Sequence, residues 1–434
     1  MKSKVLAMVM SVVMTGSLLS GCGGSTSEVS EADAADEGVS VKEEAVQETE
    51  DSEEEIEITF FHYLEQYQDQ FDTLVAMYKE VKPNVTLKVE CIGGDYDKIL
   101  QTRVATGEVP DIFASGSYTK NEVYSSVSYD LTNENFISDI EIGPEFIASN
   151  GEMSAFPFTS QAWGILYNMD IFEQAGITKL PETLEELQGV CETLKAAGIT
   201  PFAQGYNSSY VKSQLFGFPF AVDNNFIENI DKLSAKEAEL KDFEFIGKIF
   251  DMAGLIGDYT QENPFDDDFA SAAARLGLGE VAMMTQGDWG VENALKANPD
   301  ARIGIMALPL SDNPEDAKVY LSASVGLHVN KDSEHLDEAL AFTNWLVTSQ
   351  EAKDWISKYL KALSAINGVS PEGSQALNDA VAYMEAGKTV PWGSSTFPSG
   401  VGSELEPAID KFLLGEMSKE DAIEEMSRVW AALE

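Results

Sequence analysis

The sequence predicts a protein of the α/β class, in which strands and helices alternate around a wound sheet. Ile56–His62 and Val85–Ile92 alternate in the manner of half-buried strands. Phe71–Val81 and Tyr96–Thr106 carry apolar residues at helical spacing, and Gly107–Phe113 is a turn that leads into a short apolar strand. Because strands and helices follow one another in this order, we expect a wound α/β sheet.

The length and charge of the chain limit what it can bind. It has 434 residues and a formal net charge of −46. Without an N-terminal tether, roughly 380 residues remain, which is enough for two compact lobes. Such a negative surface repels phosphate backbones, so we expect no nucleic-acid partner. An anionic ligand would need a cationic pocket, and Lys and Arg are few.

The first residues have the pattern of an export signal. Lys2 and Lys4 precede an apolar run that ends in Leu19-Ser-Gly-Cys22. This pattern predicts a signal peptide over residues 1–22 that is too short to span a membrane. The small residues before Cys22 resemble a bacterial lipobox, which implies that Cys22 is lipidated and tethers the protein to the outer face of the cell membrane. The alternative is an ordinary secretory signal with a chance cysteine.

Residues 23–55 differ in composition from the rest of the chain. They begin with Gly, Ser and Thr and end in a run of acids, with almost no aromatic residues. Such a segment cannot bury enough apolar area to fold, so we expect a solvated acidic spacer. An acidic tail that binds cations is the alternative.

The remaining cysteines and a run of aspartates could suggest a metal site. Cys91 lies in a strand pattern and Cys191 in a helical one, in different predicted lobes, so we expect two unpaired thiols and no metal site. Asp266–Asp268 precedes the helical stretch Phe269–Leu276, and acids at a helix N-terminus explain it better than a calcium site. We expect no metal and no cofactor.

Phe156–Gly176 is the segment around which the other motifs are arranged. Pro157, Thr159 and Ser160 predict an open, non-helical entry to an apolar strand over Ala162–Tyr167. Gln161 and Trp163 lie where the loop becomes a strand, so an amide and an indole could reach one cleft. A buried strand with a core tryptophan is the alternative.

The end of this segment carries a family resemblance. Asn168 and Asp170 can cap a helix over Ile171–Gln174, which Gly176 ends. The run GILYNMDIFEQAGI…LPETLEEL resembles the place where extracellular solute-binding proteins of ATP-binding cassette (ABC) importers cross from one lobe to the other. LGEVAMMTQGDW and the return segment around "SVGLHVN…AFTNWL" resemble the same family.

The resemblance implies an architecture. It is the two-lobed periplasmic-binding-protein-like fold of type II, with a hinge between the lobes and crossings near residues 160, 315 and 367. Lobe 1 would then hold residues 56–160 and 316–366. Lobe 2 would hold residues 161–315 and 367–434.

The resemblance also implies a set of ligand-binding residues. By match to the family's motifs these are Ser115, Ser117, Gln161, Trp163, Tyr206, Asn207, Gln286, Asp288, Trp289 and Trp392, with Phe397 as the substitute for Trp392. Simple turn serines remain the alternative for the first two, and non-cleft tyrosine for Tyr206. His328 is a lone strand histidine, for which we expect a structural role.

A sugar-binding member of this family would close its lobes on a carbohydrate, most simply an oligosaccharide. Indole faces would stack on the sugar and amides, hydroxyls and acids would bond its hydroxyl groups. The implied partners are that ligand, the permease subunits of an importer and the membrane through the lipid. The protein would act as a monomer.

Other functions are weighed by the motifs they need. The chain has no dinucleotide fingerprint, no phosphate-binding Gly-Lys-Ser/Thr loop, no His-Glu-x-x-His and no Gly-x-Ser-x-Gly. We therefore expect no enzyme. A secreted glycoside hydrolase remains the rival, because no spacing identifies or rules out a carboxylate pair. A binding protein for another solute and a surface adhesin are further alternatives.

Overall fold

The computed structural model describes residues 55–93, 95–140, 143–398 and 400–433, which belong to one compact unit. The predicted signal peptide over 1–22, the predicted lipidation at Cys22 and all but the last residue of the predicted spacer over 23–55 lie outside this range. Within the described ranges, every helix is too short or too polar to cross a membrane.

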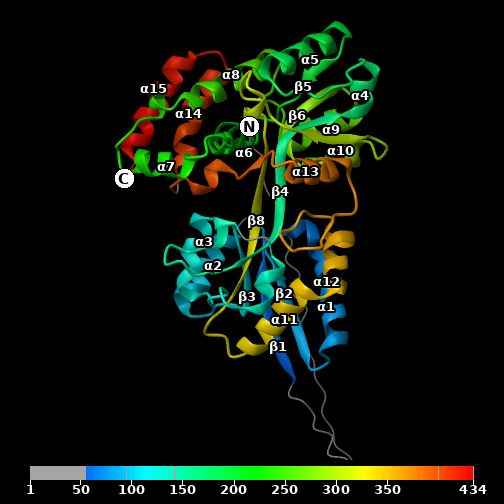
Figure 1. The fold of residues 1–434 in the computed structure, drawn as a ribbon, viewed down its shortest axis with the longest axis vertical. Coiled ribbons are helices and arrows are strands. Elements are labelled where there is room, and N and C mark those ends of the chain that lie inside the picture. Colours follow the sequence, from blue (N-terminus) through cyan, green and yellow to red (C-terminus); the bar gives the residue numbers. More distant parts are fainter. Residues whose placement is uncertain (1–54, 94, 141–142, 399, 434) are drawn as a thin grey trace, which may run out of the picture. The chain divides into compact units, whose positions relative to one another are not determined.

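The described part contains strands and helices throughout (Figure 1). The strands are β1 Ile56–His62, β2 Val85–Cys91, β3 Ile112–Ser115, β4 Phe156–Asn168, β5 Thr200–Phe202, β6 Val281–Gly287, β7 Ile303–Met306, β8 Val319–Val329 and β9 Thr389–Val390. The α-helices are α1 Gln68–Val81, α2 Tyr96–Thr106, α3 Thr119–Tyr124, α4 Met169–Gln174, α5 Leu184–Ala196, α6 Ser209–Gly217, α7 Phe226–Ser234, α8 Glu244–Asp258, α9 Phe269–Leu278, α10 Gly290–Ala297, α11 Leu336–Thr348, α12 Gln350–Trp355, α13 Gln375–Glu385, α14 Val401–Leu413 and α15 Lys419–Ala432.

The strands of the described part are joined in one mixed sheet. Its order is β2-β1-β3-β8-β4-β6-β5, with β7 paired to β4 and β9 paired to β8. β1 runs parallel to β2 and to β3, as the strand–helix–strand order predicted. β8 then runs antiparallel to β3 and to β4. The predicted α/β class is confirmed.

Two long strands connect the halves of the sheet. Over Phe156–Trp163, β4 pairs with β8, and the two strands run side by side in Figure 1. Beyond that stretch β4 pairs with β6 and β7, whereas the other end of β8 pairs with β3. The chain thus passes from one half of the sheet to the other along β4 and returns along β8.

The buried apolar side chains fall into separate clusters on the two sides of this crossing. One cluster includes Phe60, Phe71 and Trp355 and draws only on residues before 159 and between 325 and 366. A second, which includes Phe250 and Trp430, starts at Trp163. Each large side chain in these clusters stabilises the fold by about 1.5–3 kcal/mol through burial.

The prediction of an open, non-helical segment before the strand over Ala162–Tyr167 is wrong. Pro157, Thr159 and Ser160 are buried and belong to β4, whose pairing with β8 shifts between Pro157 and Thr159 and again at Ser160. Proline has no N–H to donate, so an irregular pair is where a strand tolerates it. The partner strand lies about 165 residues further along the chain, so no local pattern reveals it.

Several local predictions are confirmed. The Asn168 side chain accepts hydrogen bonds from the N–H groups of Asp170 and Ile171 and caps α4. Asp268 caps α9 by accepting from the N–H of Ser271, so the last acid of the run lies at the helix N-terminus as expected. Cys91 and Cys191 are both free thiols.

Candidate functional site

A cavity of about 530 Å³ lies where the halves of the sheet meet. Its lining residues come from the segments after β1, β2 and β3, including the first turns of α2 and α3, from β8 and from the segment after β9; they are Tyr63, Glu65, Gly93, Tyr96, Asp97, Gly116, Ser117, Thr119, Lys120, Ser324, Trp392, Ser394 and Ser395. β1, β2 and β3 are parallel, so their carboxyl ends open on one edge of the sheet, which is where ligands bind in open α/β sheets. We call this cavity the cleft.

The first wall of the cleft is held by Tyr96. Its hydroxyl lies 2.6 Å from the carbonyl oxygen of Ala114 and accepts a hydrogen bond from the Ala114 N–H at 3.1 Å. Its ring stacks on Phe61 and lies edge-on to Tyr63. These contacts tie the ends of β1 and β3 together, so the loops that follow them are fixed in position.

The charges of this wall are mostly acidic. Lys120 pairs with Asp97 at 3.0 Å, so its charge is already balanced. Glu65 is exposed at the cleft and adds a negative charge. Burial raises the pKa of Tyr63, so its phenol stays neutral and its oxygen can accept a hydrogen bond. The cleft can therefore bond neutral hydroxyl-bearing molecules and repels anions.

The floor of the cleft is formed by β8. The Tyr63 hydroxyl donates to the carbonyl oxygen of Ser324 at 3.3 Å. From the opposite side, the indole N–H of Trp392 donates to the carbonyl oxygen of Tyr320 at 3.0 Å. One aromatic side chain from each half of the molecule is thus attached to the same crossing strand.

The second wall is aromatic. Trp392 stacks on Phe218 with ring centres 4.5 Å apart and planes 8° apart. Trp289 lies edge-on to Trp392 with ring centres 5.9 Å apart. A Cβ on Gly393 would meet the backbone of Gly217 and Ala221, so only glycine allows this segment to lie so close beneath the wall.

Two of the sequence-predicted site residues line the cleft, and a third adjoins it. Ser117 and Trp392 are among the lining residues, and Trp289 touches Trp392. The Trp289 ring covers Gly287, where a Cβ would overlap it. The structure therefore brings together the two C-terminal tryptophans and one serine of the predicted set.

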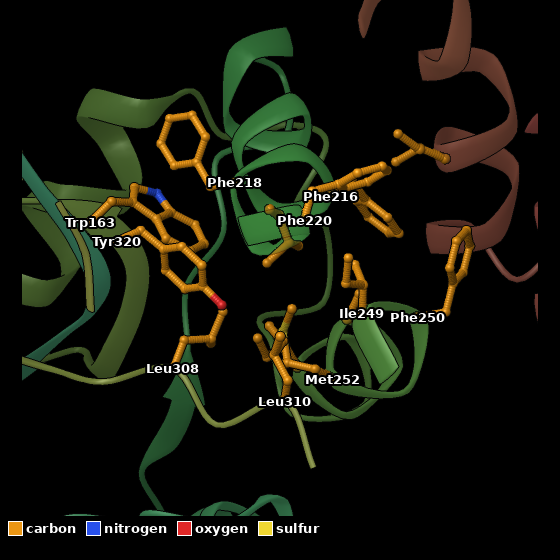
Figure 2. Close-up of a cluster of buried hydrophobic side chains, with 14 of the residues drawn as sticks. Trp163, Phe216, Phe218, Phe220, Ile249, Phe250, Met252, Leu308, Leu310 and Tyr320 are labelled. Carbon is orange, nitrogen blue, oxygen red and sulfur yellow. The ribbon is translucent and has the colours of Figure 1, made fainter. Parts of the chain in front are cut away.

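Trp163 lies behind this wall. It has no exposed surface and packs edge-on against Phe218 and Tyr320, inside the large core cluster drawn in Figure 2. Its indole N–H has no hydrogen-bond partner. Trp163 supports Phe218, which in turn supports Trp392, so in this structure its indole is one layer removed from the cleft.

Other predicted residues also lie away from the cleft. Ser115, Tyr206 and Gln286 are buried: Ser115 lies 2.7 Å from a ring nitrogen of His328, Tyr206 packs on Phe265, and Gln286 accepts from the N–H of Gly287. Gln161 is half-buried, Asn207 is exposed, and neither lines the cleft. Phe397, the substitute for Trp392, packs against Phe220 and Trp430.

Asp288 clamps the crossing strand. Its carboxylate accepts from the N–H of Ala162 at 2.9 Å, and its own N–H donates to the carbonyl oxygen of Ala162 at 2.9 Å. Burial raises the pKa of this carboxyl to about 7, and the hydrogen bonds only partly offset that effect. The side chain holds the turn after β6 against β4.

Sequence reasoning missed most of the polar wall. Tyr63, Glu65, Asp97 and Lys120 line the cleft but belong to no motif that the sequence offers. One rule could have found the first three: they follow the carboxyl ends of β1 and β2, where cleft residues of open α/β sheets gather.

The chain is similar to a known family over most of its described part. Residues 63–353 match the family model described as "Bacterial extracellular solute-binding protein". The melibiose/raffinose/stachyose-binding protein MelE of Bacillus subtilis is 22% identical over 299 residues, which are 66% of this chain and 68% of that protein. A multiple sugar-binding protein of Streptococcus mutans is 23% identical over 315 residues, 69% of this chain and 72% of that protein.

Solved structures share the fold. The apo form of RafE from Streptococcus pneumoniae has a TM-score of 0.73 at 19% identity and covers 87% of this chain and 97% of its own. RafE in complex with raffinose has a TM-score of 0.72 at 20% identity and covers 86% of this chain and 98% of its own. The fold is therefore that of the two-lobed solute-binding proteins.

Proposed function

Because the chain belongs to the bacterial extracellular solute-binding protein family, as the match over residues 63–353 shows, we propose that its solute is an uncharged oligosaccharide. The protein would hold this sugar in the cleft and deliver it to the permease subunits of an ABC importer. Relatives named for melibiose, raffinose, stachyose and multiple sugars support this choice of solute.

The wall of Trp392 opposite a wall of hydroxyls and acids is the observation that carries the proposal. An indole face offers apolar area to the C–H face of a sugar ring. Tyr63, Ser117 and Asp97 offer donors and acceptors to its hydroxyl groups. The excess of negative charge disfavours acidic sugars, and a neutral sugar needs no countercharge.

Capture would proceed by hinge closure. We propose that lobe 1 consists of residues 56–160 and 316–366 and lobe 2 of residues 161–315 and 367–434. The separate apolar clusters on the two sides of the crossing strands support a crossing near residue 160, and β8 contributes to both sides, with Tyr320 in the second cluster and Val325 in the first. A sugar that contacts both lobes stabilises the closed form by its differential affinity.

In this proposal the N-terminal residues direct the protein to the outer face of the cell membrane. Signal peptidase would cleave before Cys22, the lipid on Cys22 would hold the protein at the outer face of the cell membrane, and residues 23–55 would act as the spacer. The protein would act as a monomer. Expression of the full chain and of Cys22→Ala tests the anchor: the parent protein should partition with membranes and the variant should not.

Titration calorimetry of the purified folded part tests the ligand. We expect saturable heat with raffinose, melibiose or a related neutral oligosaccharide, and none with galacturonate oligomers of equal length. The proposal would be rejected if no neutral sugar gave a heat of binding while a polyamine or a peptide did.

We further propose that the protein leaves its sugar intact. The matched family and the compared relatives are binding proteins. In the cleft Asp97 is paired with Lys120 and Glu65 is exposed, so neither carboxyl lies in the apolar, unpaired surroundings of a general acid. Release of nitrophenol from a chromogenic glycoside, abolished in Glu65→Gln, would instead establish the hydrolase.

A further inference from the structure

The two faces of β8 look into different cavities. Ser324 lines the cleft, whereas Leu321 and Ala323, which point the other way along the strand, line a second cavity of about 330 Å³. We call this second cavity the back pocket. Its volume lies at the lower end of the range of about 300–1,000 Å³ typical of small-molecule sites.

The floor of the back pocket is built from all the crossing segments. Pro157 and Ser160 come from β4, and Leu363 and Ser364 come from the segment after α12. The N–H of Ser160 donates to the carbonyl oxygen of Leu363 at 2.8 Å, and the Ser364 hydroxyl donates to the carbonyl oxygen of Phe158 at 2.8 Å. The floor is therefore a continuous hydrogen-bonded surface.

The ends of the back pocket belong to different halves of the molecule. One end is Glu145, in the short turn Pro144–Phe146 that precedes β4. The other end is α13, which contributes Val381, Met384 and Glu385 and packs on β7. A molecule that fills this space touches both halves at once, as a ligand in the cleft does from the opposite face.

The lining has a definite chemistry. Leucine, valine, proline, alanine and methionine make up most of it, and Glu145 and Glu385 stand at its two ends. No lysine or arginine is among its described lining residues. An apolar floor beside the exposed carboxylate of Glu385 suits a small molecule with an apolar body and an ammonium group, because the carboxylate pairs with the charge and the floor removes the body from water.

We propose that the back pocket is a second ligand site, for a small hydrophobic amine, and that its occupation opposes closure of the cleft. The crossing strands lie between the two cavities, so a rotation that narrows the cleft moves the ends of the back pocket apart. An amine in contact with both ends resists that movement. By linkage, sugar and amine weaken each other's binding by the same factor. This coupling rests on the proposed sugar capture, but the amine site does not.

Benzylammonium is the probe, and benzyl alcohol is its uncharged counterpart. Binding is followed by NMR titration of the folded protein without sugar. We expect saturable millimolar binding of benzylammonium, weaker binding of benzyl alcohol, and an affinity loss of about fivefold in Glu385→Gln, the scale of one partly exposed charge pair. Glu334→Gln, an exposed glutamate outside both cavities, is the matched control and should bind as the parent does.

A variant that fills the space provides a second measurement. Met384→Trp should abolish binding of both probes, because the indole occupies the pocket, and its circular dichroism should match that of the parent. Equal affinity for the two probes, an unchanged affinity in Glu385→Gln, or probe binding to Met384→Trp would overturn the site.

The coupling is measured separately, by titrating a bound neutral sugar in saturating benzylammonium. We expect benzylammonium to weaken the binding of the sugar to the parent protein and to leave the sugar affinity of Met384→Trp unchanged. An unchanged sugar affinity in the parent protein would overturn the coupling. Failure of every sugar to bind would count against the proposed function alone, since the amine titration needs no sugar.

Discussion

Trp392 is the side chain on which ligand affinity should depend most. It stacks on Phe218, its N–H is already bonded to Tyr320, and it faces the polar wall across the cleft. A ring held on one face by packing and by a hydrogen bond loses little freedom when a sugar covers its other face. The geometry makes Trp392 a rigid platform.

Replacement of Trp392 by alanine should therefore weaken oligosaccharide binding by about 1–3 kcal/mol, the scale of a buried aromatic anchor. Trp289→Ala should cost less, because Trp289 reaches the cleft only through its edge contact with Trp392. Calorimetric titration of both variants with the same sugar checks the order. Tyr359→Ala, which removes an exposed ring away from the cleft, is the control. An equal or larger loss in Trp289→Ala would show that Trp392 is the wrong platform.

Two buried histidines make the fold sensitive to acid. Burial lowers the pKa of His62 to about 4 and that of His328 to about 3, from an ordinary value of 6.5. His328 is buried between Ser115 and Ser128 and stacks on Phe113, so the structural role expected for it is confirmed. Neither imidazole can take up a proton without losing stability.

The free energy of unfolding should therefore fall as the pH drops from about 6.5 toward 4. In that window the histidines of the unfolded chain are protonated, whereas those of the folded chain stay neutral. Each of the two histidines therefore lowers the free energy of unfolding by on the order of 3 kcal/mol between about pH 6.5 and pH 4. Urea titrations at pH 7, 5.5 and 4.5 measure the slope. His328→Gln lowers stability at pH 7 but should flatten the slope, and a slope as steep as that of the parent would contradict this assignment.

At the scale of elements, the contact between β4 and the turn after β6 is the most informative. Asp288 binds Ala162 through its side chain and its backbone, at the point where the chain enters the second half of the molecule. Because the folded carboxyl has a pKa near 7, it is protonated in part at neutral pH. Ionisation strengthens the hydrogen bond from the Ala162 N–H, but the cost of burying the charge exceeds that gain, so the fold is most stable when this carboxyl is neutral.

Asp288→Asn should raise the stability at pH 8 and have little effect at pH 4. The parent carboxyl stabilises the fold below its unfolded pKa of about 3.9 and loses that contribution, on the order of 2–4 kcal/mol, as the pH rises through 7. Asparagine keeps the acceptor for the Ala162 N–H and cannot ionise. Thermal unfolding at both pH values tests this, and Asp300→Asn, an exposed acid beyond α10, should change neither value. Equal shifts at pH 4 and pH 8 would contradict the prediction.

At the scale of the whole molecule, closure is the property that the proposed function requires. The halves have separate apolar clusters and are joined by β4, β8 and the segment at Leu363. Few strands cross between them, so a hinge rotation disturbs little packing.

Saturation with a neutral oligosaccharide should lower the radius of gyration of the folded part in small-angle scattering, because the sugar bridges the walls of the cleft. Trp392→Ala should show a smaller decrease at the same sugar concentration. A sugar that binds with no change in the scattering curve would favour a rigid site over a hinge.

Local sequence patterns were sufficient to predict many of the helices and strands and the class of the fold. Alternation over Ile56–His62, helical spacing over Tyr96–Thr106 and the cap at Asn168 act between neighbouring residues, so they can be recognised without the fold. The same holds for Ser117 and Trp392, which lie in the cleft as family motifs indicated.

Tertiary structure alone decided which side of each strand faces the cleft and what covers it. Trp163 and Gln286 lie on strands at the predicted place, yet both are buried, because Phe218 and Tyr320 cover the first and α10 lies over the second. Tyr63, Asp97 and Ser324 meet at the cleft only after residues more than two hundred positions apart are brought together. Periodicity and capping depend on residues that are near neighbours in the sequence, so they can be predicted from it. Burial and the shape of a cavity depend on contacts between residues far apart in the sequence, so only the tertiary structure decides them.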